Sequence, residues 1–148
     1  MSLKEKLSED MRSAMRTRDE VKLSTIRLVR SAIKNQEIDK GQELSDDEVV
    51  TVLMSEAKKR REAVEGAELA GRDDIAAKER AELDVLKQYL PEQIGESELE
   101  EIVRGIITEV GATSMKDKGR VMPVLMQRVR GRADGRLASE VVDRLLHP

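Results

Sequence analysis

The sequence predicts an all-α protein, with an N-terminal bundle of about four helices followed by a small three-helix C-terminal unit. Aromatic residues make up only 1% of the chain, so Leu, Val, Ile, Ala and seven Met must fill the core, a composition typical of helix packing. Charged residues make up 39% without long like-charge blocks, which suits amphipathic helices with solvated outer faces. A length of 148 residues is enough for one domain or two small ones.

Cap signals and apolar spacing place the first two helices. Ser2 can cap a first helix that ends near Asp19, and a second is expected over about residues 19–39. Apolar residues cover more than half of the second helix's circumference, so it should be central. Its basic residues at i, i+3 and i+7 form one stripe at the border of the apolar face: Arg27, Arg30 and Lys34.

The third and fourth helices are bounded by equally clear signals. Ser45 and Glu48 form a capping box at the start of a long third helix. A fourth begins near Asp73 and ends before Pro91, because the residue before a proline is disfavoured in the helical region.

Two stretches, one within the third helix and one at its end, have residue patterns similar to those of ligand-binding sites. Residues 58–61 are four consecutive cations, which fan around a helix and cannot face one ligand, so we interpret them as solvated, with pairs such as Glu56 to Arg60. Residues 66–73, GAELAGRD, lack the Lys and hydroxyl of a phosphate-binding loop and are interpreted as a helix end or turn. No cofactor is expected.

The segment LPEQI, residues 90–94, is the best candidate boundary, which gives an N-terminal bundle over 1–94 and a small basic domain over 95–148. Ser97 is expected to cap the fifth helix, with Glu100 at the capping-box position.

The last two helices surround a glycine-rich turn. The sixth is expected over about residues 115–129, and Pro123 within it should cause a kink or an irregular turn near Gly119. Gly131 closes this helix, and Asp134 can cap the seventh.

Charge is unevenly distributed along the chain. Residues 1–111 carry nineteen Lys or Arg and twenty-six Asp or Glu, whereas residues 112–148 carry eight and four. Within residues 116–136, seven cations accompany three glycines: Lys116, Lys118, Arg120, Arg128, Arg130, Arg132 and Arg136, with Gly119, Gly131 and Gly135. An acidic body with a basic tail indicates a phosphate-bearing partner.

Several function classes are disfavoured. There is no cysteine, and the one histidine, His147, is next to the end of the sequence, so neither a thiol site nor a Ser-His-Asp arrangement can be built. The acidic residues show no metal-ligand pattern, and no apolar run approaches 20 residues, so neither a metal nor a membrane span is expected. We expect a cytoplasmic protein that is not catalytic on its own.

Four stretches carry a family resemblance: LSTIRLVRSAIKNQEID (23–39), LPEQI (90–94), EVGATSMKDKGRVM (109–122) and GRADG (131–135). In this order and spacing they resemble the stand-alone YqeY-like proteins of the GatB/YqeY-domain family. The C-terminal half also resembles the tail domain of the B subunit of the glutamine-dependent tRNA amidotransferase, in which other domains and subunits perform the chemistry.

The resemblance implies an all-α fold and contact with tRNA. By motif match, the tRNA-facing candidates are Lys116, Gly119, Arg120, Gly131, Arg132, Asp134 and Gly135. Pro123 departs from the family pattern, in which a glycine or small residue is common at that position.

We therefore expect an accessory protein that binds tRNA or another structured RNA and is related to the amidotransferase machinery. Arginine suits phosphate because its fork donates two parallel hydrogen bonds. Two alternatives remain open. One is an interaction module that docks on amidotransferase or aminoacyl-tRNA synthetase subunits, and the other is carbon-nitrogen ligase activity, with glutamine as amido-N-donor, only within a larger complex.

Overall fold

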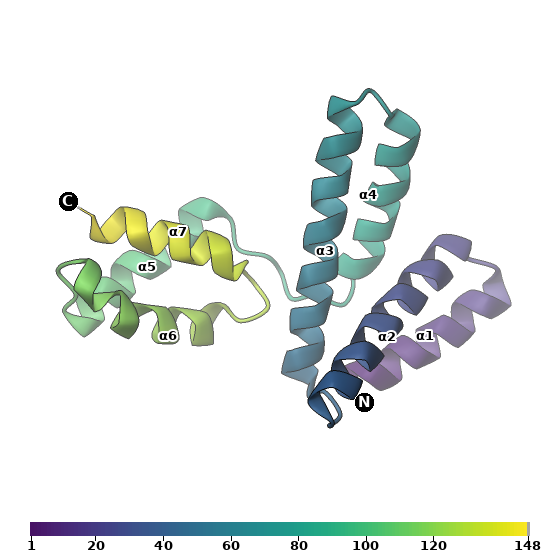
Figure 1. Ribbon diagram of the computed structural model, residues 1–148, viewed down its shortest axis with the longest axis horizontal. Helices are drawn as coiled ribbons and strands as arrows, with labels where there is room; N and C mark the ends of the chain where they lie inside the picture. Colours follow the sequence, from purple (N-terminus) through teal and green to yellow (C-terminus); the bar gives the residue numbers. More distant parts are fainter. Residues whose placement is uncertain (148) are drawn as a thin grey trace. The chain divides into compact units, whose positions relative to one another are not determined.

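The computed structural model describes residues 1–147 and consists of α-helices joined by short turns, which confirms the predicted all-α fold (Figure 1). No strand occurs among these residues, and none of their helices is long and apolar enough to cross a membrane. The helices are α1 (Leu3–Thr17), α2 (Glu20–Lys40), α3 (Asp46–Leu69), α4 (Asp73–Lys87), α5 (Glu96–Val110), α6 (Lys118–Val129) and α7 (Gly135–Leu146), with a 3-10 turn, η1 (Met115–Asp117), before α6.

The chain divides into two compact units, residues 1–90 and 91–148, each with its own core. This division lies four residues before the expected boundary, because Ile94 is only 7% exposed and packs in the C-terminal core. The division falls within the LPEQI segment, since Leu90 packs against the N-terminal core and Ile94 packs in the C-terminal core.

In the N-terminal unit, α1 pairs with α2 and α3 pairs with α4 as two helical hairpins (Figure 1). Helix α2 contacts α1, α3 and α4, and it buries Ile26, Val29 and Ile33. Helix α2 is thus central, as its composition predicted, but it is not fully covered. Leu28 is 49% exposed and Val21 is also exposed.

A buried ion cluster joins α3 to α4. Arg60 lies 3.4 Å (Nη1) from Glu56 Oε1 and 3.3 Å (Nε) from Glu82 Oε2. The three side chains are 9–11% exposed. The predicted pair of Glu56 with Arg60 is confirmed. The expectation that residues 58–61 are solvated is wrong for Arg60, because this pair is buried and Glu82 of α4 adds a second carboxylate.

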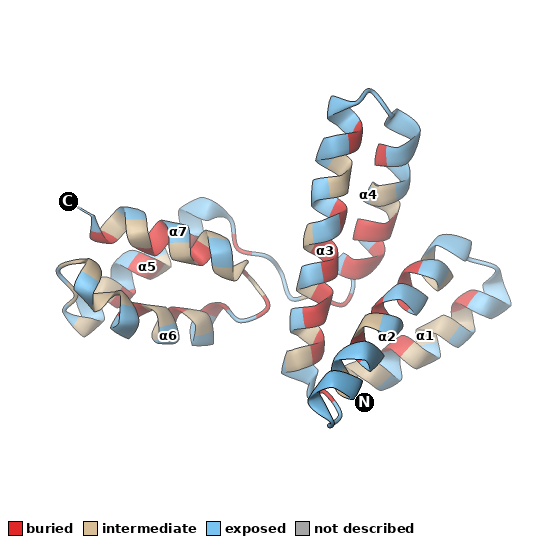
Figure 2. Ribbon diagram, in the orientation of Figure 1, coloured by how far each residue is buried: buried red, intermediate tan, exposed pale blue. Residues whose placement is uncertain are grey.

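The C-terminal unit packs α5, α6 and α7 around one apolar core (Figure 2), with Leu99, Val103 and Ile106 from α5 facing Val121 and Leu125 from α6. Helix α5 begins at Glu96 with Gly95 as its cap, so the Ser97 cap was wrong by two residues.

Pro123 lies inside α6, which is continuous from Lys118 to Val129, so the irregular turn expected at this proline is absent. The chain bends before the proline instead, at η1, where Ser114 and Asp117 form a capping box.

Arg60→Ala should destabilise the N-terminal unit by about 3–5 kcal/mol, because it leaves the buried Glu82 without its counter-charge and Glu56 with Lys59 alone. Urea denaturation followed by circular dichroism measures the change. Arg61→Ala, which removes the exposed neighbour, is the control and should change stability by less than about 0.5 kcal/mol. If both variants lose the same free energy of unfolding, the buried ion cluster around Arg60 does not stabilise the N-terminal unit as predicted.

Candidate nucleic-acid interface

The LPEQI segment and the GRADG turn are hydrogen-bonded to each other. The Ile94 N–H donates to the Arg132 carbonyl (2.8 Å), and Gln93 Nε2 donates to the Gly131 carbonyl (2.8 Å). In return, Arg132 Nε donates to the Glu92 carbonyl (3.2 Å). We call residues 91–94 and 130–136 together the turn platform. Two of the stretches that carry the family resemblance, about 40 positions apart in the chain, thus form one structure.

Glycine and aspartate define the backbone of the turn platform. Gly131 is buried and has a φ of +77°, a left-handed conformation that favours glycine. Its neighbours bond back to the end of α6, since the Arg132 and Ala133 N–H groups both donate to the Val129 carbonyl. Asp134 caps α7 by accepting from the Arg136 N–H (3.1 Å), so its carboxylate occupies part of the helix terminus that a phosphate would use.

The arginines at this end of the unit lie beside acidic side chains. Arg128 Nη2 donates to both carboxylate oxygens of Glu109 on α5 (2.7 and 2.9 Å). Arg132 lies 3.9 Å from Glu98, and Arg136 lies 3.6 Å from Glu140. Arg128, Arg130 and Arg136 are exposed, and Arg132 is half-buried. These cations therefore reach solvent from within a network of surface ion pairs.

The remaining predicted residues gather at the other end of α6. Lys118 Nζ bonds to Ser139 (2.8 Å) and pairs with Asp143 (2.6 Å), which ties α6 to α7. Arg120 donates to the Val110 carbonyl and to Asp117. Lys116 and Gly119 are exposed, and a Cβ at Gly119 would meet open space.

The predicted set is thus split into two groups. Ten residues separate Lys118 from Arg128, about 15 Å along a helix axis. The structure brings Arg130, Arg132, Asp134, Gly135 and Arg136 together around Gly131. It places Lys116, Lys118, Gly119 and Arg120 in a second group beside η1.

The C-terminal unit is not basic as a whole. Residues 91–148 contain nine Lys or Arg and ten Asp or Glu, a net charge of −1, whereas residues 1–90 contain eighteen and twenty, a net of −2. The excess of cations is confined to residues 112–148, because residues 91–111 of the same unit carry six carboxylates and one arginine. Its cations form a local cluster instead of a broad positive field.

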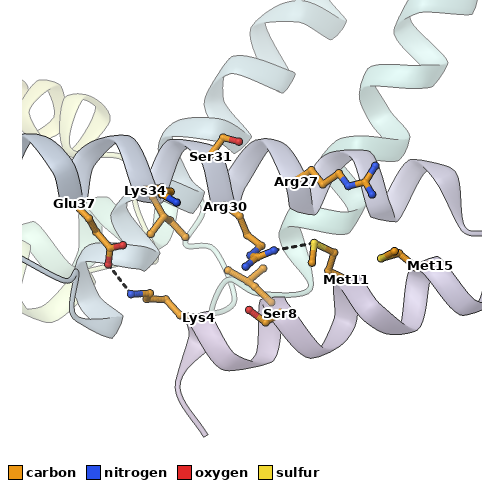
Figure 3. A pocket seen from close by; sticks show the side chains of 11 residues that line it. Lys4, Ser8, Met11, Met15, Arg27, Arg30, Ser31, Lys34 and Glu37 are labelled. Carbon is orange, nitrogen blue, oxygen red and sulfur yellow. Dashed lines mark hydrogen bonds and ion pairs between the residues drawn. The ribbon is translucent and has the colours of Figure 1, made fainter.

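The structure also shows a groove that the sequence reasoning did not single out. It lies between α1 and α2, has a volume of about 770 Å³, and is lined by Lys4, Leu7, Ser8, Met11, Met15, Arg27, Arg30, Ser31, Ile33, Lys34 and Glu37 (Figure 3). The signals for it were the basic stripe of α2, the broadly apolar second helix and the seven Met, for which a place in the core was the favoured interpretation. At one end, hydrogen bonds from Lys4 and from the Leu44 amide hold the pKa of Glu37 below its usual range.

Among the described residues, no group of three or more His, Cys, Asp and Glu side chains could hold a metal ion. The turn platform offers guanidinium groups, which bind anions. The groove between α1 and α2 offers guanidinium and ammonium groups beside apolar surface, which suits a partner chain.

The protein is thus of the all-α class and has two compact units. In the C-terminal unit, the LPEQI segment and the GRADG turn are hydrogen-bonded to each other. The chain belongs to the YqeY-like family, since the model of that family, described as Yqey-like protein, matches residues 4–146. The family resemblance of the sequence is confirmed.

Curated relatives share the name "Altered inheritance of mitochondria protein 41, mitochondrial". The Pyrenophora tritici-repentis protein is 30% identical over 130 residues, covering 86% of this chain and 71% of its own length. A Saccharomyces cerevisiae protein is 34% identical over 95 residues, covering 64% and 51%. The Eremothecium gossypii protein is 34% identical over 85 residues, covering 57% and 46%. The chain spans about half the length of the last two.

The cytoplasmic location predicted from the sequence is wrong by this comparison, because these relatives are named as mitochondrial proteins. The prediction used the absence of cysteine and of a long apolar run. Neither property separates the cytosol from the mitochondrial interior.

Gly131→Ala should destabilise the C-terminal unit by about 1–2 kcal/mol, because a Cβ strains a left-handed residue. Gly119→Ala, in open space on α6, is the control and should leave stability equal or raise it by up to about 1 kcal/mol. Urea denaturation measures both. Equal stability of the two variants would show that the platform does not depend on the Gly131 conformation.

At low pH, protonation of Asp117 should reduce the stability of the segment around η1. Hydrogen bonds from the Thr113 amide and from Arg120 lower the pKa of Asp117 to about 2. The ordinary pKa of an aspartate is about 3.9, so this carboxylate stabilises the fold above that pH, and its contribution is lost as the pH falls toward 2. Asp117→Asn should lower the thermal midpoint at pH 7.

The difference in thermal midpoint between the native protein and the Asp117→Asn variant should shrink as the pH falls from about 4 to about 2. Glu101→Gln, which removes an exposed carboxylate from α5, is the control for the loss of one charge. If the difference in thermal midpoint is the same at every pH, the ionised Asp117 carboxylate does not stabilise the fold as proposed.

Proposed function

We propose that this protein is a non-catalytic accessory that binds structured RNA, in particular tRNA, and works with the tRNA-dependent amidotransferase machinery. The observation that carries the proposal is the turn platform, which holds Arg130, Arg132 and Arg136 on a hydrogen-bonded backbone. A rigid backbone lowers the entropy lost when these side chains meet a phosphate.

The ion pairs around the platform are compatible with this role. Exposed pairs contribute only about 0–1 kcal/mol, so a phosphate can replace Glu98 or Glu140 as the partner of an arginine at little cost. Phosphate and carboxylate both accept the two parallel hydrogen bonds of a guanidinium fork. The acidic neighbours would then act as competitors that restrict binding to closely fitting phosphates.

The composition of the unit favours contact with the RNA backbone. The single aromatic residue of the chain, Tyr89, lies in the N-terminal unit and is buried, with its hydroxyl donating to Asp10. No aromatic ring is therefore available to stack on an unpaired base. The proposed surface reads shape and phosphate position, as expected for the outside of a folded RNA.

The names of the relatives say nothing of RNA or of amide transfer. The proposal depends on the geometry of the platform and on the resemblance to the amidotransferase tail domain.

Titration of fluorescently labelled tRNA at several salt concentrations tests the proposal. The logarithm of the affinity should fall linearly with the logarithm of the salt concentration, and Arg130→Gln with Arg136→Gln should reduce that slope by about 1.5–2. Arg132 is left intact because its Nε holds the Glu92 carbonyl.

Arg61→Gln with Arg104→Gln removes two exposed arginines outside the predicted set and is the matched control, with no change of slope expected. Absence of binding at low salt would overturn the RNA function. If the control pair reduces the salt slope by the same amount, RNA binding cannot be assigned to the turn platform.

A second candidate function, an interaction module, is favoured by a different observation, which is the groove between α1 and α2.

A further inference from the structure

The groove between α1 and α2 has two chemically different sides (Figure 3). Leu7 of α1 and Ile33 of α2 form its buried floor, Met11 and Met15 of α1 offer the accessible apolar surface, and the basic stripe of α2 lies along the edge. Met15 is 52% exposed, although it is a large apolar side chain beside the core. The groove therefore combines uncovered apolar surface with positive charge.

The cations of the α2 stripe are available to a partner. Arg27, Arg30 and Lys34 form no ion pair with any residue that the structure describes, in contrast to the arginines of the turn platform. Arg30 Nη1 donates to the Met11 sulfur at 2.9 Å. A thioether is a weak acceptor, so a carboxylate would be a stronger partner for this guanidinium.

The one acidic residue of the groove is already engaged. Glu37 Oε2 accepts from Lys4 Nζ (2.6 Å) and from the Leu44 N–H (2.8 Å). Glu37 therefore pairs with Lys4 at one end of the groove and also attracts Lys34 of the stripe, while Arg27 and Arg30 lie farther along the α2 edge.

We propose that this groove binds an amphipathic helix of a partner protein, with an apolar face against Met11 and Met15 and an acidic flank along the α2 stripe. The stripe runs i, i+3, i+7, about 10 Å along the axis, which matches carboxylates at the same spacing on a helix laid alongside. Methionine side chains adapt to varied apolar surfaces, as is usual where helices dock.

Other occupants fit less well. An RNA backbone would satisfy the cations but leave the Met11 and Met15 surface uncovered, with no ring in the groove for its bases to stack on. A second copy of this chain would have to supply an acidic amphipathic helix, and α5, whose first turn is acidic, already buries Leu99, Val103 and Ile106 in its own core.

The test uses the full chain and a labelled 16-residue helical peptide, with Leu along one face and Glu along the flank, in fluorescence anisotropy. A companion peptide carries Lys in place of each Glu. The acidic peptide should bind the native chain, and Arg27→Glu with Lys34→Glu should weaken that binding by about tenfold or more, because two attractive pairs become repulsive. The companion peptide should bind this variant more tightly than it binds the native chain.

Arg12→Glu with Arg16→Glu makes the same charge change on exposed positions of α1 outside the groove and should leave binding unchanged. Met15→Ser should weaken binding without changing its salt dependence, because it removes apolar contact and no charge. Circular dichroism confirms that each variant is folded.

Equal binding of the acidic and basic peptides would overturn the proposal, as would an equal loss in the α1 control. Displacement of the peptide by tRNA, with tRNA binding lost in the Arg27→Glu and Lys34→Glu variant, would show a nucleic-acid surface instead. The RNA function proposed for the platform is tested by other residues, so either proposal can fail alone.

Discussion

The hydrogen bond from the Ile94 amide to the Arg132 carbonyl is the constraint on which the C-terminal unit depends. It joins the segment that enters the unit to the turn between its last two helices, and Gln93 and Arg132 add bonds on either side. With Ile94 buried, the chain has to turn at Gly95 and begin α5 there. The position of α5 then decides which carboxylates face the arginines of α6 and of the turn.

This arrangement explains why a cluster rich in arginine carries no strong positive field. Glu98 and Glu109 come from α5, and Glu140 comes from α7, so the packing of the three helices brings the neutralising charges to the cations. Arg144 of α7 is held in the same way by Glu96 and Glu100. Within residues 1–147, no carboxylate lies within ion-pair distance of the α2 stripe, although the charge of Glu37 acts on Lys34. This contrast leads to two different proposals for two sets of cations.

Much of the fold could be predicted because its signals are local. The capping box of Ser45 and Glu48 is formed as expected, since both partners lie within one helical turn. The pairing of Arg60 with Glu82 could not be predicted, because it depends on how α4 packs against α3. For the same reason, the sequence showed where the arginines around Gly131 lie but not their partner carboxylates. The groove was missed because the spacing of Met11 and Met15 is equally compatible with a buried position.

The central claim is that RNA contacts the turn platform. The most direct measurement is an NMR titration of the isotope-labelled full chain with unlabelled tRNA at low salt, which reports on every backbone amide separately. The account predicts that the amides of residues 130–136 and 92–94 shift together and that those of α1 and α2 stay in place. The claim would be contradicted if no amide shifts, or if the shifts are confined to the N-terminal unit.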